Sequence, residues 1–146
     1  MNSRVCVDAN LALKLVLVEE DSPKAHHLWE TWVDAGVEVI APPLLAFEGT
    51  SVICNKVFRG LVPPEEAELM FRAFHLLGVR FLYPDGLHEK AWELAKRFNR
   101  PQAYGSHYLA LAEMLGLELW TADTRLHNAA KHQLSWVKWL GDYELT

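Results

Sequence analysis

The chain lacks any long apolar run. No hydrophobic stretch approaches the ~20 consecutive residues that a membrane-spanning helix needs. The N-terminus also lacks the basic region followed by an apolar one that marks a secretion signal. We therefore expect a protein without a membrane segment, with the cytoplasm as its location.

Cysteine is scarce, and its spacing excludes the usual metal and redox motifs. The 2 cysteines, Cys6 and Cys54, form no C-x-x-C pair, and each lies among apolar residues. We predict two buried thiols. The histidines show no H-E-x-x-H or comparable zinc spacing, which favours structural or surface roles for them.

An excess of positive charge is absent as well. The chain has 14 lysines and arginines against 19 aspartates and glutamates, for a formal net charge of -5. A domain that binds nucleic acid through a general basic surface would show the opposite balance. Binding to RNA or DNA would therefore require a local basic patch or a bound cation. The basic residues are scattered, and many suit solvated helix ends.

What the chain does have is an ordinary globular composition and a regular order of elements. Its 146 residues are 51% hydrophobic and 23% charged, which predicts one folded domain over residues 1–146. No linker rich in serine, proline or glycine divides it, and no internal repeat is present.

Strand-like and helix-like segments alternate along the chain. Strands are expected at residues 4–8, 37–41, 79–83, 117–122 and 135–139, and helices at residues 10–20, 21–36, 44–60, 65–78, 85–98, 104–115 and 123–131. This alternation predicts an α/β protein with three layers, in which a central, mostly parallel sheet of about five strands is flanked by helices on both faces.

Two acids stand at predicted strand ends. Asp8 closes V-C-V-D and Asp123 closes L-W-T-A-D, each directly before a predicted helix. In an open parallel sheet, functional sites form beyond the carboxyl ends of the strands. Each aspartate alone also suits a plain helix N-cap, which is a common use of this residue.

A third acid, Glu48, lies on a predicted helix one turn after Leu44 and one turn before Val52, on a largely apolar surface. A buried carboxylate without a partner is costly, so such a residue needs a cation or a similar partner. The alternative is a glutamate at the edge of the helix that points to water. Glu48 therefore joins Asp8 and Asp123 as a candidate site residue.

Several segments together resemble the PIN domain, the nuclease fold of VapC-type toxins, from end to end. They are VDANLALKLVL, APPLLAFEGTSVICN and AYGSHYLALAEMLGLELWTAD, with the same order of helices between them. The most specific part is the Tyr-x-x-x-Tyr-Leu-Ala-Leu-Ala-Glu helix followed by a short strand and Thr-x-Asp. The resemblance implies a PIN-like fold in which Asp8, Glu48 and Asp123 hold a metal ion, supported by Asn10 and Thr121.

The activity that this resemblance implies is metal-dependent hydrolysis of RNA by an endoribonuclease. Mg²⁺ and Mn²⁺ prefer oxygen ligands and tolerate several close carboxylates. The bound ion activates water and stabilises the charge that grows on a phosphodiester. Arg125 and Arg59 are the basic residues expected to contact the substrate, although a solvated arginine is the alternative for Arg125.

The same resemblance implies a set of partners. A VapC-type toxin belongs to a type II toxin-antitoxin pair, so the chain would bind a small antitoxin protein besides its RNA substrate. It would also form a homodimer, through the apolar helices between Pro43 and Gly78.

One departure from the family pattern concerns the start of the helix at residues 104–115. PIN domains usually carry an acid there, in a Tyr-Asp-x-x-Tyr setting, and this chain has Gly105. Ser106 is a neutral substitute, and His107 lies about 200° further around an ideal helix. We count both as supporting candidates. Gly105 indicates lost activity, a tolerated change, or a helix N-terminus open to a substrate phosphate.

The alternative function is therefore a catalytically impaired PIN protein that binds nucleic acid or another protein. Two further classes fit less well. A phosphotransfer enzyme with Asp8 as nucleophile would want a second acid in Asp-x-Asp, and the chain reads Asp8-Ala9-Asn10. Nucleotide-binding folds need a glycine-rich loop after the first strand, which is absent here.

Overall fold

A parallel sheet forms the centre of the computed structural model, which describes residues 3–145. Its strands are β1 (Arg4–Val7), β2 (Glu38–Ala41), β3 (Arg80–Phe81), β4 (Leu119–Thr121) and β5 (Val137–Trp139). They lie in the order β3-β2-β1-β4-β5, and every neighbouring pair is parallel. The predicted sheet of about five, mostly parallel strands is confirmed.

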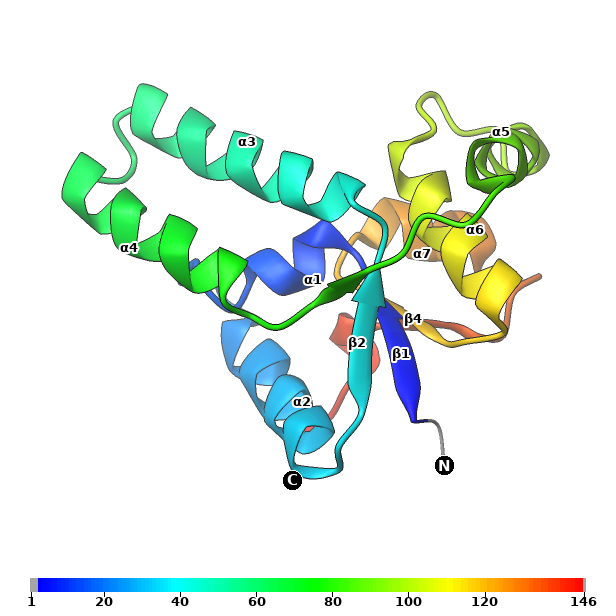
Figure 1. Ribbon diagram of the computed structural model, residues 1–146, viewed down its shortest axis with the longest axis horizontal. Helices are drawn as coiled ribbons and strands as arrows, with labels where there is room; N and C mark the ends of the chain where they lie inside the picture. The colour runs from blue at the N-terminus through cyan, green and yellow to red at the C-terminus, as the bar shows by residue number, and fades with distance from the viewer. Residues whose placement is uncertain (1–2, 146) are drawn as a thin grey trace.

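Helices cover both faces of this sheet. They are α1 (Ala9–Leu13), α2 (Ser22–Asp34), α3 (Leu44–Phe58), α4 (Pro64–His75), α5 (Leu87–Arg97), α6 (Tyr104–Leu115), α7 (Thr124–Ala130) and the short 3₁₀ helix η1 (Leu140–Asp142). Figure 1 shows α2 on one side of the sheet and α6 on the other, with α5 packed outside α6. The predicted three-layer α/β fold is therefore confirmed.

The central strands are apolar because both of their faces are covered. In β1, Val5, Cys6 and Val7 are all buried, and the buried leucines of α1 and α6 pack in the same core. Val7 lies opposite Trp120 in the register between β1 and β4. The residues that follow these two strands therefore emerge side by side at the carboxyl edge of the sheet.

The helix predicted at residues 10–20 is wrong beyond Leu13. Short-range backbone bonds form a turn there, with the amides of Lys14, Leu15 and Val16 bonding carbonyls three residues back. The Ser22 hydroxyl then donates to the Leu17 carbonyl at 2.9 Å. An apolar run of leucines and valines does not distinguish a continuous helix from a packed turn, and this turn is fixed by contacts further along the chain.

The prediction of two buried thiols is half wrong. Cys6 is buried in β1, and burial raises the pKa of its thiol to about 12. Cys54 is exposed on α3. Its apolar sequence neighbours lie on other faces of the helix, because successive helical residues point about 100° apart.

Helices α3 and α4 form a hairpin that extends away from the sheet (Figure 1). Gly49 permits their close contact, because a Cβ at this position would overlap the ring of Phe74. The hairpin also carries much of the exposed apolar surface of the chain, including Phe47, Phe58, Leu69, Phe71 and Leu76. Within residues 3–145, every helix is too short or too polar to cross a bilayer.

Candidate functional site

The three acids singled out from the sequence line a single pocket at the carboxyl edge of the sheet. Asp8 follows β1, Glu48 projects from α3, and Asp123 follows β4 and precedes α7. The pocket has a volume of about 270 Å³. Parallel strands and the helix that follows β2 bring these residues together from distant parts of the chain. We call this the acidic pocket.

Asp8 is the most buried of the three, with 3% of its surface exposed. It caps α1: its Oδ1 accepts a hydrogen bond from the Leu11 amide at 2.9 Å, and its Oδ2 accepts one from the Thr121 hydroxyl. Burial raises the pKa of Asp8 to about 6, although these hydrogen bonds lower it, and the negative charge of Asp123 raises it further. A carboxylate here is therefore held in place but poorly solvated.

Asp123 caps α7 in the same way. Its Oδ1 accepts from the amides of Arg125 at 2.9 Å and Leu126 at 3.2 Å. Its own amide donates to the Thr121 hydroxyl at 2.8 Å. Thr121 thus contacts both aspartates, which fits the supporting role predicted for it. Both aspartates are helix caps and pocket residues at once, so the two interpretations of the sequence are compatible.

Glu48 is half buried and is positioned by a residue to which the sequence analysis assigned no role. The hydroxyl of Tyr108, from α6, donates a hydrogen bond to Glu48 Oε1. Burial raises the pKa of Tyr108, and the charges of Glu48 and Asp8 raise it further, so the phenol stays protonated and remains a donor. The signal was present in the Tyr-x-x-x-Tyr pattern, whose second tyrosine faces the pocket.

In the described part of the chain, none of the three acids forms an ion pair with a lysine, arginine or histidine. Arg100 and Arg125 line the acidic pocket without approaching a carboxylate within ion-pair distance. Three acids therefore share one pocket without a direct ion pair, which is an electrostatic situation that a bound cation relieves.

The donor set fits a hydrated ion better than a closed metal cage. In residues 3–145, no three histidine, cysteine, aspartate or glutamate side chains lie close enough to hold a metal ion together. Mg²⁺ commonly keeps several waters and binds through only one or two carboxylates. Glu48 Oε2 and Asp123 Oδ2 make no hydrogen bond to described residues, so both are available as ligands.

The wall of the acidic pocket opposite α3 contains the glycine that departs from the family pattern. Gly105 lines the pocket near the start of α6. A Cβ added there would meet only the two methyl groups of Leu126, at 3.5 and 3.7 Å, which is ordinary van der Waals contact. The backbone therefore has room for a larger side chain. Asn10, a predicted supporting residue, is exposed and lines the same pocket.

Three other predicted residues are not brought to the pocket. Ser106 is fully buried, and its hydroxyl has no hydrogen-bond partner among the described residues. His107 turns away, with Nδ1 against the Ala103 carbonyl at 2.7 Å and Nε2 against His88 at 2.8 Å. Arg59 is exposed at the far end of α3. On a helix, residues next to Gly105 necessarily point to other sides.

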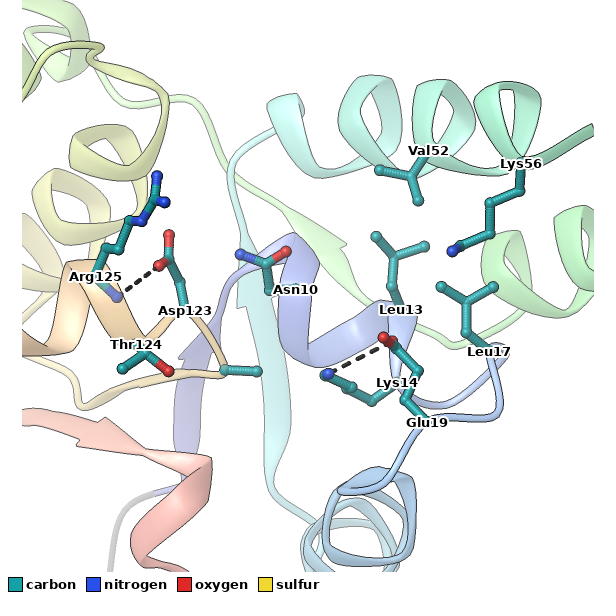
Figure 2. A pocket seen from close by; sticks show the side chains of 11 residues that line it. Asn10, Leu13, Lys14, Leu17, Glu19, Val52, Lys56, Asp123, Thr124 and Arg125 are labelled. Carbon is teal, nitrogen blue, oxygen red and sulfur yellow. Dashed lines mark hydrogen bonds and ion pairs between the residues drawn. The ribbon is translucent and has the colours of Figure 1, made fainter. Parts of the chain in front are cut away.

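A second pocket, of about 520 Å³, adjoins the first, with which it shares several lining residues. Figure 2 shows the side chains that line this second pocket. We call it the basic groove, because Lys14, Lys56 and Arg125 line it together with two acids, Glu19 and Asp123. Sequence reasoning missed Lys14, which it placed within a long helix, and gave Lys56 no role. Arg125 lines both pockets, and its contact with a substrate stays a prediction.

Comparisons with known proteins bear on the fold alone. No protein-family model matches the chain, and no curated protein matches it. Among solved structures, the crystal structure of PAE2754 from Pyrobaculum aerophilum is similar, with a TM-score of 0.65 and 21% sequence identity. The match covers 92% of this chain and 91% of that one, so the similarity extends over nearly the whole fold.

Proposed function

We propose that this protein is a Mg²⁺- or Mn²⁺-dependent endoribonuclease of the PIN type that hydrolyses phosphodiester bonds in RNA. The observation that carries the proposal is the convergence of Asp8, Glu48 and Asp123, remote in sequence, around one pocket without a paired cation. The resemblance of the flanking segments to PIN domains supports the same assignment, and the cytoplasm is the expected place of action.

In this proposal the three carboxylates would hold a hydrated ion, in part through its waters, and the ion would supply a nucleophile from water and a positive charge at the phosphate. Thr121 fixes Asp8 through its hydroxyl, and Tyr108 fixes Glu48. Such hydrogen bonds orient ligand oxygens and limit their motion. Asn10, on the rim, is placed to donate to a phosphate oxygen or to orient a water.

Gly105 favours a second candidate, a PIN protein that binds RNA or another protein but cleaves poorly. The pocket lacks a carboxylate at this position, and three acids neutralise less metal charge than four. Three acids are enough to bind a single ion. They are less suited to the pair of ions that many phosphodiesterases use.

Cleavage of RNA with added Mn²⁺ tests both candidates. The chain should cleave slowly, Asp8→Asn should abolish cleavage, and Gly105→Asp should raise the rate about tenfold or more, because Gly105 lines the pocket and a carboxylate there would add a ligand. Gly105→Asn is the matched control of equal size without charge, and it should not raise the rate. Equal activity in all four proteins would refute the nuclease mechanism. Binding of RNA without cleavage, even by the Gly105→Asp variant, would favour the second candidate.

As a VapC-type protein, the chain would be the toxin of a type II pair and would bind a small antitoxin protein. A reading frame for such a protein next to its gene would support this proposal, and its absence would count against it.

We also propose a homodimer built on the α3–α4 hairpin. The exposed aromatic and aliphatic side chains of this hairpin, among them Phe58 with 88% of its surface exposed, make an apolar surface of the kind that interfaces cover.

A further inference from the structure

We propose that the basic groove binds the phosphate backbone of the RNA strand beside the scissile bond, with Lys56 and Arg125 as the phosphate contacts. This inference rests on the proposed function, since it assigns a path to that function's substrate. The groove is lined from α1, α3 and the start of α7, so it adjoins the acidic pocket directly.

The two cavities are neighbours. Asn10, Leu13, Val52, Asp123 and Arg125 line both of them. A strand whose phosphate lies in the acidic pocket would pass over these shared residues into the basic groove.

Two of the three basic residues are free to bind an anion. Lys56 and Arg125 take part in no ion pair within the described part of the chain. Lys14 differs, because it pairs with Asp21 at 2.9 Å and with Glu19 at 3.4 Å. Burial lowers the pKa of Lys14, but these two acids raise it by more, so its charge is retained and already compensated.

The positions of the free cations favour a polymer of phosphates over a single anion. Figure 2 shows Lys56 and Arg125 at opposite ends of the groove, with Asn10 and Leu13 between them. Successive phosphates of one strand can occupy the two ends at the same time. The lining also includes the aliphatic side chains of Leu13, Leu17 and Val52, which offer contact to ribose or base without reading sequence.

The balance of charge differs between the two cavities. Three acids and two arginines line the acidic pocket, whereas three basic residues and two acids line the basic groove. The basic groove is therefore the better site for a phosphate when no metal is bound. RNA binding should therefore have a component that survives chelation, and this component should depend on Lys56 and Arg125.

Fluorescence anisotropy with a labelled single-stranded RNA tests this inference separately from catalysis. A probe of about 16 nucleotides is long enough to fill such a groove. Binding is measured in EDTA, where metal-dependent cleavage is suppressed, over a range of salt concentrations. The proteins compared are the natural chain, Lys56→Gln, Arg125→Gln, the charge-retaining Lys56→Arg, and Lys131→Gln. Lys131 is exposed at the end of α7 and lines neither cavity, so it controls for loss of one charge.

Lys56→Gln and Arg125→Gln should each weaken binding about threefold to fivefold. Each should also reduce the slope of log K against log salt by about 0.7, the value for one phosphate contact on a single strand. Lys56→Arg and Lys131→Gln should match the natural chain.

Three results would overturn the inference. They are unchanged binding in both groove variants, equal weakening in the Lys131→Gln control, and an unchanged salt slope in both groove variants. Loss of cleavage in Mn²⁺ by every protein, with groove-dependent binding intact, would instead refute the proposed nuclease function and leave this site standing.

Discussion

Replacement of Asp8 by asparagine should make the metal-free protein more stable near neutral pH. The carboxyl group is almost fully buried, with 3% exposed, and burial raises its pKa to about 6 from the ordinary value of 3.8. Each tenfold change in proton affinity corresponds to about 1.36 kcal/mol. An ionised Asp8 therefore costs the folded state about 3 kcal/mol relative to the unfolded chain.

The pH range of this cost follows from the direction of the shift. Below about pH 4 the group is protonated in both states and costs nothing. Between about pH 4 and pH 6 the unfolded chain releases its proton while the folded protein keeps it, so stability falls as pH rises. Above the folded pKa the full cost remains. The asparagine side chain would carry no charge, so the variant should not show this fall.

The net gain is smaller than the full cost. The Thr121 hydroxyl now donates to Asp8 and would have to accept from the new amide, a change worth about 1 kcal/mol. The variant should therefore exceed the natural chain by about 2 kcal/mol near neutral pH and fall below it by about 1 kcal/mol near about pH 4, where only the altered hydrogen bond counts. Urea denaturation in EDTA at several pH values measures the free energy of unfolding of both proteins. The other titratable groups are the same in both, so their contribution cancels in the difference between the two free energies.

A variant less stable than the natural chain at neutral pH, or a difference that does not change with pH, would refute this reasoning. Added Mn²⁺ provides a second readout. It should stabilise the natural chain, because a ligand that binds only the folded state raises the free energy of unfolding. It should stabilise the Asp8→Asn variant much less, since one of the ligand carboxylates is missing.

Three further predictions concern other parts of the structure. Tyr108→Phe removes the donor to Glu48 and should weaken Mn²⁺ binding about tenfold, measured by calorimetry, while the fold persists by circular dichroism. Gly49→Val places a side chain against the ring of Phe74 and should lower the free energy of unfolding by about 1–3 kcal/mol in urea denaturation. Phe58→Glu should convert a dimer to a monomer in light scattering with little effect on thermal stability, and a natural chain that is itself monomeric would refute the proposed dimer.

The sequence was sufficient to predict the fold class and to single out three acids that line one pocket. Alternating strands and helices identified the parallel sheet, and in such a sheet the residues after β1 and β4 must lie at one edge. The positions of Asp8 and Asp123 follow from that topology alone. Glu48 was identified because a carboxylate on an apolar helical surface is unusual.

What the sequence could not predict depends on long-range contacts. The end of α1 at Leu13 is fixed by a turn that Ser22 holds. The contact of Tyr108 with Glu48 joins residues 60 positions apart. His107 was misplaced because its direction depends on where α6 begins, and Lys14 was missed because its role depends on the turn that follows α1.

The Thr121 hydroxyl has a consequence for how this chain can change over evolution. It donates to the carboxylate of one aspartate and accepts from the amide of the other, and it is completely enclosed. One side chain therefore contacts the Asp8 carboxylate and the Asp123 backbone, so a substitution at position 121 would disturb both acids at once. Substitutions that adjust the affinity for a cation are consequently expected on the Glu48 and Gly105 walls, where each side chain can vary alone.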